Sequence, residues 1–296
     1  MSFIKTPKQE EATKILAGSA HHVLLTGGSR SGKTLLLLYA ITVRCLRAPH
    51  STHCIIRRVF KDVKQTIGLT SFPQMMRLCF PSVEYTVNRA EWYIDIVAGY
   101  DEANKPMISR IWLAGLDDIA ERDERILGRE FSTLFFNEVV EIAYSSVLTA
   151  LTRLAEKNVL VNKAYYDCNP TSKKHWVYQL FVQHQDPVSS LKVAENDYAI
   201  YQLNPIDNLD NLDVNYLETL KRMPARKRQR FLDGQWADEE RGKLWHREWI
   251  DDYRVQTCPQ LRRIVIAIDP AVSANKTSDD FGVSIAGVGR DKHYYV

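Results

Sequence analysis

The chain has 296 residues, of which 45% are apolar and 25% charged, and this composition excludes a disordered or fibrous protein. Its length is sufficient for about two domains. The formal net charge of +3, from 39 basic and 36 acidic residues, is too small to identify a nucleic-acid-binding protein by itself. Contact with a nucleic acid would therefore depend on local basic patches.

The N-terminal segment MSFIKTPKQEE has no apolar signal core, and the longest apolar run, residues 35–43, is much shorter than the ~20 residues of a membrane span. The sequence therefore predicts a protein that is not secreted and has no membrane partner. The five cysteines include no CxxC pair, which favours free thiols over disulfides or structural zinc. His50, His53 and Cys54 lie close together, but no second ligand pair follows them.

Apolar, β-branched runs alternate with amphipathic stretches over the first two-thirds of the chain, a pattern typical of parallel strands connected by helices. The predicted strands are residues 22–26, 53–57, 92–97, 108–114, 133–136 and 159–166, and the predicted helices are 33–46 and 144–156. The fold class expected is α/β, with a mostly parallel sheet flanked by helices.

The amino-acid composition changes around residues 186–213, which are rich in Asp, Asn and Pro. A surface helix is predicted at 214–232. It contains RMPARKRQR (222–230), which has several basic residues and no acid. This run is either a nucleic-acid contact or a solvated helix face.

The last segment contains two predicted strands, RRIVIAID (262–269) and FGVSIAGVG (281–289). Two strands without a helix are too few for a complete domain. We therefore expect a core domain at 1–190, a lid or linker at 191–258, and the first part of a further domain at 259–296.

A phosphate-binding loop lies between the first predicted strand and the first predicted helix. It fits the pattern GxxxxGK[ST] and consists of Gly27, Gly28, Ser29, Arg30, Ser31, Gly32, Lys33 and Thr34. Glycines let the backbone wrap around phosphates, and the helix presents its positive end to them. Lys33 is expected to neutralise the β- and γ-phosphate oxygens, and Thr34 to bind Mg²⁺.

The strand 133–136 ends in Asn137 and Glu138, at the sheet edge where open α/β folds bind ligands. Glu138 is the predicted catalytic base that activates the attacking water. Asn137 stands where an Asp would normally hold Mg²⁺ through water, and its neutral amide adds no charge. The alternative is that these residues only cap a helix.

A third polar strand end follows, in the sequence Tyr166-Asp167-Cys168-Asn169-Pro170. Because an amide both donates and accepts hydrogen bonds, Asn169 is a candidate for coupling the γ-phosphate or the attacking water to the rest of the fold. The alternative is an ordinary turn.

With these motifs in order, the sequence resembles phage large terminase subunits, the motors that package viral genomes. The resemblance extends over nearly the whole chain. It rests on GGSRSGKT, LGREFSTLFFNEV, CNPTSKKHWVYQLF, LDGQW and IAIDPA. It implies a P-loop ATPase domain with additional strands, followed by a ribonuclease H-like nuclease domain.

The resemblance also implies particular roles for residues in and around the loop. Gln9 matches an adenine-contacting glutamine, and Arg30 matches an arginine frequent in the loop of this family. Arg129 is our candidate arginine finger, acting in this subunit or from a neighbouring one, with Arg125 second. The alternative for Gln9 is a surface polar residue, and for Arg129 a surface ion pair.

In the nuclease domain, Asp269 looks like the first metal-binding carboxylate for Mg²⁺ or Mn²⁺, and Asp279 or Asp280 is a weaker candidate. The family's other acidic residues are expected beyond residue 296, which puts DNA cleavage by this chain in doubt.

The function implied is an ATP- and Mg²⁺-dependent motor that moves double-stranded DNA into a procapsid in the cytoplasm of an infected bacterium. The expected partners are DNA bound through its backbone, the portal protein, the small terminase subunit, and further copies of the chain in a ring. Two alternatives are a host helicase-like or recombination ATPase and a nucleotide switch that does not hydrolyse ATP.

Overall fold

The computed structural model describes residues 4–116, 128–238, 254–255, 257–269 and 282–296. The chain forms two compact units, Met1–Glu239 and Glu240–Val296. Within the described ranges, no helix is both long and apolar enough to cross a membrane.

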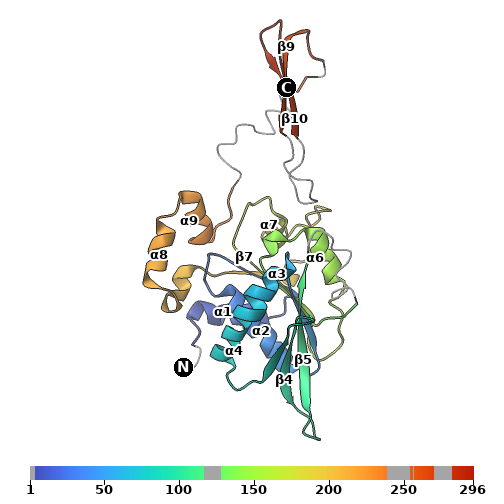
Figure 1. Cartoon of the computed structure of the whole chain (residues 1–296), viewed down its shortest axis with the longest axis vertical. Helices are drawn as coiled ribbons and strands as arrows, with labels where there is room; N and C mark the ends of the chain where they lie inside the picture. The colour runs from blue at the N-terminus through green and yellow to red at the C-terminus, as the bar shows by residue number, and fades with distance from the viewer. Residues whose placement is uncertain (1–3, 117–127, 239–253, 256, 270–281) are drawn as a thin grey trace. The chain divides into compact units, whose positions relative to one another are not determined.

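The first unit is built on an eight-stranded sheet of order β3-β4-β5-β2-β6-β7-β1-β8 (Figure 1). Its strands are β1 (His22–Thr26), β2 (Thr52–Arg57), β3 (Tyr85–Asn88), β4 (Tyr93–Tyr100), β5 (Pro106–Gly115), β6 (Thr133–Phe136), β7 (Lys163–Cys168) and β8 (Tyr198–Gln202). The six strands from β5 to β8 in this order pair in parallel, and β3 and β4 form an antiparallel edge. The predicted mostly parallel sheet is confirmed.

Helices cover both faces of this sheet. They are α1 (Pro7–Ala17), α2 (Lys33–Arg47), α3 (Phe60–Asp62), the π-helix η1 (Val63–Ser71), α4 (Phe72–Cys79), α6 (Tyr144–Leu151) and α7 (Trp176–Phe181). Two further helices, α8 (Val214–Lys221) and α9 (Ala225–Phe231), follow β8, and none of their described residues belongs to the two cores of the sheet. Short 3₁₀ turns form η2 (Val139–Glu141), η3 (Glu195–Asp197) and η4 (Pro205–Asn211).

Two apolar cores lie on the opposite faces of the sheet. Successive side chains of a strand point to opposite faces, so Val23 and Leu25 of β1 belong to the core under α1, α2 and α4, whereas Leu24 belongs to the core under α6 and α7. The side chains of Val23, Leu24 and Leu25 are all fully buried. The sheet is therefore fixed on both faces, and its strand ends are rigid supports for side chains.

Several predicted boundaries differ from the structure. The predicted helix at 214–232 is two helices, α8 and α9, because Pro224 between them lacks an N–H and disfavours helical geometry in the residue before it. The predicted strand at 159–166 begins only at Lys163, and the predicted helix at 144–156 ends at Leu151. Strands β3 and β8 and the helices between residues 60 and 79 had no prediction.

The main sheet extends past residue 190, where the core domain was expected to end. β8 pairs in parallel with β1 from His22↔Tyr198 to Thr26↔Gln202, so residues well beyond 190 belong to the main sheet. The first compact unit extends to Glu239. β8 had no prediction, although its sequence YAIYQ begins with four consecutive apolar residues, and its side chains are only partly buried at the edge of the sheet.

The second unit contains a three-stranded antiparallel sheet of order β11-β10-β9. Its strands are β9 (Leu261–Asp269), β10 (Gly282–Gly289) and β11 (Tyr294–Tyr295), which confirms the two predicted strands. Asp269 is the last residue of β9 and pairs with Gly282. Asp279, Asp280 and Arg125 lie outside the described residues.

Candidate nucleotide site

The phosphate-binding loop leaves β1 at a position that requires glycine. Gly27 has a φ of 130°, and a Cβ built there would lie 1.9 Å from the carbonyl oxygen of Leu203. Gly32 has a φ of 90° and directly precedes the first residue of α2, Lys33. These two glycines let the loop turn tightly from strand to helix, and the loop ends at the N-terminus of α2.

Lys33 lies folded against the loop. Its Nζ donates to the carbonyl oxygens of Gly27 and Gly28, at 3.2 and 2.5 Å, and to Oγ of Ser31 at 3.1 Å. A further bond of 3.1 Å reaches Oδ1 of Asn169, the residue that follows β7 by one position. Burial lowers the pKa of Lys33 to about 8. Lys33 and Asn169, each predicted separately as a site residue, therefore meet at the loop.

A buried carboxylate from β7 lies beside the loop. Oδ2 of Asp167 accepts a 2.6 Å hydrogen bond from Oγ1 of Thr34, and Oδ1 accepts one of 2.7 Å from the backbone N–H of Glu138. Nδ2 of Asn137 donates to both carboxylate oxygens, at 2.9 and 3.1 Å. Asp167 is 2% exposed, and burial raises its pKa, opposed by these donors and by Lys33.

Glu138 follows β6 and projects into the cavity at the loop. It adopts a left-handed backbone conformation with a φ of 53°, and its Oε2 pairs with Nη2 of Arg57 at the end of β2. This ion pair occupies one of the two carboxylate oxygens of Glu138. Arg57 is a site residue that the sequence did not reveal, because an arginine at a strand end has no distinctive pattern.

Gln9 on α1 is buried and lies at the loop. Its Oε1 accepts from the backbone N–H of Thr6, at 3.1 Å, and its Nε2 donates to Oδ1 of Asn208 in η4, at 3.0 Å. Nδ2 of Asn208 donates in turn to the carbonyl oxygen of Arg30, at 3.0 Å. The predicted Gln9 thus belongs to the site, and Asn208, which was not predicted, connects it to the loop.

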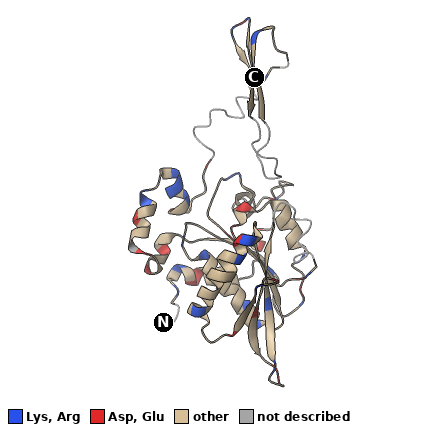
Figure 2. Cartoon of the chain, viewed as in Figure 1, with Lys and Arg blue, Asp and Glu red and all other residues tan. Residues whose placement is uncertain are grey.

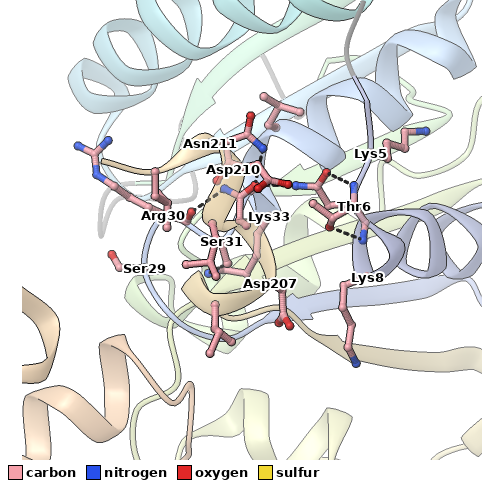
Figure 3. A pocket seen from close by; sticks show the side chains of 18 of the residues that line it. Lys5, Thr6, Lys8, Ser29, Arg30, Ser31, Lys33, Asp207, Asp210 and Asn211 are labelled. Atoms are coloured by element: carbon pink, nitrogen blue, oxygen red, sulfur yellow. Dashed lines mark hydrogen bonds between the residues drawn. The ribbon is translucent and has the colours of Figure 1, made fainter. Parts of the chain in front are cut away.

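Gln9, Lys33, Thr34 and Asn208 line one cavity of about 1410 Å³. In Figure 3, Lys33 and Ser31 lie between Arg30 on one side and Thr6 on the other. Glu138, Asp167 and Asn169 also line the cavity. Asn137 does not line it, because its side chain lies behind Asp167 and is 4% exposed.

The end of α9 contacts the loop directly. The backbone N–H of Ser29 donates to the carbonyl oxygen of Phe231 at 2.8 Å, and the N–H of Gly28 donates to Oδ1 of Asn204 at 3.0 Å. A Cβ at Gly28 would lie 2.5 Å from the same Phe231 oxygen. The segment after β8 and the helix α9 therefore pack against the phosphate-binding loop.

Arg129 lies away from this cavity. It precedes β6, whereas Glu138 follows it, so the two residues are at opposite ends of the strand. The guanidinium of Arg129 lies 3.7 Å from the centre of the Trp112 ring, in a separate hollow beside Thr52. The structure does not bring Arg129 to the nucleotide site of its own chain, and any role as a finger would require a second subunit.

Asp167 was not predicted as a site residue, although the sequence contains a signal for it. Asp167 is a charged residue within a buried, aromatic strand end, YYDC, directly before the predicted Asn169. Charged residues are seldom fully buried without a specific partner. Asp167 lies next to Thr34 because β7 lies between β1 and β6 in the sheet, and the sequence alone does not give this strand order.

The fold and the site together define a P-loop nucleotide-binding protein of the α/β class. The family described as "Terminase large subunit, T4likevirus-type, N-terminal" matches residues 24–252. The chain therefore belongs to the large terminase subunit family.

Solved structures of large terminases share this fold. The large terminase of a thermophilic bacteriophage, in complex with ADP, is 17% identical, with a TM-score of 0.64 over 98% of this chain and 68% of that one. The ATPase domain of the Thermus phage P74-26 large terminase is 15% identical, with a TM-score of 0.57 over 79% of this chain and 95% of that one. No match was found among curated proteins.

Proposed function

We propose that this chain hydrolyses ATP to drive double-stranded viral DNA into a procapsid. The observation that carries the proposal is the convergence of Lys33, Glu138 and Asn169 on a single cavity at the P-loop, after the neighbouring strands β1, β6 and β7. Membership of the large terminase subunit family supplies the link to genome packaging. The relative from the thermophilic bacteriophage was solved with ADP and with ATP-γ-S, which supports a nucleotide as the ligand.

The side chains suit phosphoryl transfer to water. Lys33 neutralises charge on the β- and γ-phosphate oxygens, and Glu138 accepts a proton from the attacking water. Asn169 holds Lys33 and senses the γ-phosphate position through that bond. A bound Mg²⁺ would add charge neutralisation between the phosphates, with the Thr34 hydroxyl as one ligand. Gln9 would read the adenine edge after releasing Asn208.

The decisive experiment measures ATP hydrolysis and DNA protection together. We expect steady-state hydrolysis by the purified chain and further stimulation by procapsids that carry a portal. Encapsidated DNA would become resistant to nuclease. Stimulation by forked DNA instead would favour a helicase-like enzyme, and nucleotide binding without any turnover would favour a switch.

DNA binding is proposed to involve the basic side chains of α9. Figure 2 shows Lys and Arg gathered on this helix. Arg226, Lys227 and Arg228 are exposed there, and the helix ends at Phe231, whose carbonyl contacts the phosphate-binding loop. A motor that moves along DNA must bind every base pair alike, so contacts to phosphates rather than bases are expected.

Replacing Arg226, Lys227 and Arg228 together with glutamine is expected to weaken DNA binding and to flatten its salt dependence. Each lost phosphate contact should lower the slope of log affinity against log salt by about 0.9. The measurement is DNA affinity at several salt concentrations on two unrelated duplexes. The matched control replaces three exposed basic residues elsewhere in the same unit, Lys61, Arg77 and Lys105. If both triple variants behave alike, α9 is a solvated face.

The proposed assembly is a homo-oligomeric ring that works with the portal protein and the small terminase subunit in the host cytoplasm. Arg129 suits such a ring, because it is exposed and lies away from the nucleotide cavity of its own chain. It could therefore contact a nucleotide that is bound to the adjacent subunit. In that position it would stabilise charge on the transferring phosphoryl group.

Nuclease activity is proposed to depend on Asp269 together with further carboxylates. Asp269 is the one acidic residue in the described strands β9 to β11. Two-metal hydrolysis requires several carboxylates around ions about 4 Å apart. Asp269→Ala is therefore expected to lower any cutting of plasmid DNA in Mg²⁺ or Mn²⁺. Efficient cutting that persists in Asp269→Ala would contradict this expectation.

A further inference from the structure

The nucleotide site contains a carboxylate in an unexpected place. The strand β6 ends in Asn137, whose neutral amide provides no charge for a cation. Four acidic residues line the cavity: Glu138, Asp167, Asp207 and Asp210. Glu138 pairs with Arg57, and Asp207 accepts the backbone N–H of Asn204 at 2.8 Å. Of the four, Asp167 is the residue hydrogen-bonded to Thr34 of the phosphate-binding loop.

We propose that Asp167 is the metal-binding carboxylate of this P-loop site, and that Asn137 positions it. The inference rests on the proposed function, because it assumes that the loop binds a nucleotide with its divalent cation. The negative charge usually expected after β6 is here supplied by β7, the next strand in the sheet.

The contact between Asp167 and the loop hydroxyl supports this assignment. Oδ2 of Asp167 lies 2.6 Å from Oγ1 of Thr34, at the start of α2. A cation that takes Thr34 as a ligand would therefore have Asp167 in its first or second shell of oxygens. Carboxylate and hydroxyl oxygens are the hard ligands that Mg²⁺ prefers, and Mg²⁺ commonly keeps several waters between itself and the protein. The residues present thus fit the ion.

The hydrogen bonds that hold the Asp167 carboxylate support it as well. Asn137 Nδ2 donates to both of its oxygens, and the backbone N–H of Glu138 donates to Oδ1 at 2.7 Å. The donors come from the end of β6, which is paired with β7 up to Phe136↔Tyr166. They fix the rotation of Asp167 while Oδ2 remains directed at Thr34. Metal-binding carboxylates are commonly oriented by supporting hydrogen bonds of this kind.

The same pairing explains why residue 137 is an amide. An aspartate there would place a second carboxylate against Asp167, at the distance where Asn137 now donates hydrogen bonds. Two like charges in a buried pair disfavour ionisation of both. An asparagine removes this repulsion and satisfies the buried oxygens. Asn137 and Asp167 therefore act as a matched pair, with the charge on the member that lines the cavity.

The test measures binding rather than turnover. A fluorescent ADP analogue is titrated into the wild type, Asp167→Asn and Asn137→Ala, once with EDTA and once over a series of Mn²⁺ concentrations. We expect Asp167→Asn to bind nucleotide in EDTA within about twofold of the wild type, but to need at least ~10-fold more Mn²⁺ for half-maximal enhancement. Asn137→Ala should give a smaller shift, because the carboxylate remains but is less well oriented.

Asp101→Asn is the matched control, because it makes the same change at an exposed aspartate that does not line the cavity. Its Mn²⁺ requirement should equal that of the wild type. A Mn²⁺ requirement in Asp167→Asn that equals the wild-type value would overturn the proposal. If Asp167→Asn does not fold, as judged by thermal unfolding, Asp167→Glu keeps the charge but displaces the oxygens. A normal Mn²⁺ requirement in that variant would equally overturn it.

Failure of the proposed function would look different. A wild type that binds no nucleotide, with or without metal, would contradict the P-loop assignment. A wild type that binds nucleotide with Mn²⁺ enhancement, beside an unaffected Asp167→Asn, would reject only the role of Asp167.

Discussion

Lys33→Ala is expected to lower both nucleotide affinity and the rate of ATP hydrolysis, the latter by at least ~10²–10³-fold. Nζ of Lys33 is buried and surrounded by Gly27, Gly28, Ser31 and Asn169, so the ammonium group is already held at the loop before phosphate arrives. Its loss removes a positive charge from both the bound state and the transition state.

Glu138→Gln is expected to lower the rate of ATP hydrolysis without lowering nucleotide affinity. Glutamine keeps the size of the side chain but cannot accept the proton from water, so turnover should fall by about 10²–10⁴-fold while nucleotide affinity stays near the wild-type value. The measurements are single-turnover hydrolysis and binding of a fluorescent nucleotide, and Glu141→Gln nearby serves as the control. Full turnover in Glu138→Gln would remove Glu138 from the role of base.

Gly27→Ala is expected to destabilise the first unit and to abolish nucleotide binding. The new Cβ would lie 1.9 Å from the Leu203 carbonyl oxygen, and the φ of 130° is strained for any residue with a side chain. Backbone strain and steric overlap each cost about 1–3 kcal/mol, so a loss of roughly 3 kcal/mol or more in the free energy of unfolding is expected. Because Leu203 follows β8, the damage should spread from the loop to the sheet edge.

Thermal unfolding measures this effect. A loss of ~3 kcal/mol corresponds to a fall in Tm of roughly 6–12 °C for a unit of this size. Gly18→Ala is the control, because Gly18 has an ordinary φ of −64° and the nearest contact of its Cβ would be 3.1 Å, so the cost there should stay within about 1 kcal/mol. Equal Tm values for Gly27→Ala and the wild type would show that the loop has another conformation in solution.

The elements with the strongest local patterns were predicted from sequence. The strand His22–Thr26 and the strand Thr133–Phe136 were assigned with their observed bounds, because both are buried on two faces and read as continuous apolar runs. The half-exposed edge strand Tyr198–Gln202 was not assigned, although it also contains a short apolar run, because it lies within a segment rich in Asp, Asn and Pro that was interpreted as a linker.

The site divides in the same way. The phosphate-binding loop and Glu138 were predicted because their chemistry depends on consecutive residues next to a strand. Arg57 and Asn208 were not predicted as site residues, because neither belongs to a motif of distinctive spacing, and Asp167 was not predicted although it lies two residues before Asn169. Arg129 shows the converse. It is close to Glu138 in sequence, but β6 lies between the two residues and places them at opposite ends of the strand.

The sequence by itself determined the P-loop, the α/β class and the family resemblance, because each is encoded in short segments whose residue types dictate local geometry. Only the tertiary structure decided which charges share the cavity. The order β6-β7-β1 places Asp167 beside Thr34 and leaves Asn137 behind it, and the return of the chain through β8 brings Asn208 to Gln9. Strand order arises from packing of the whole sheet between its two cores, which no local pattern specifies.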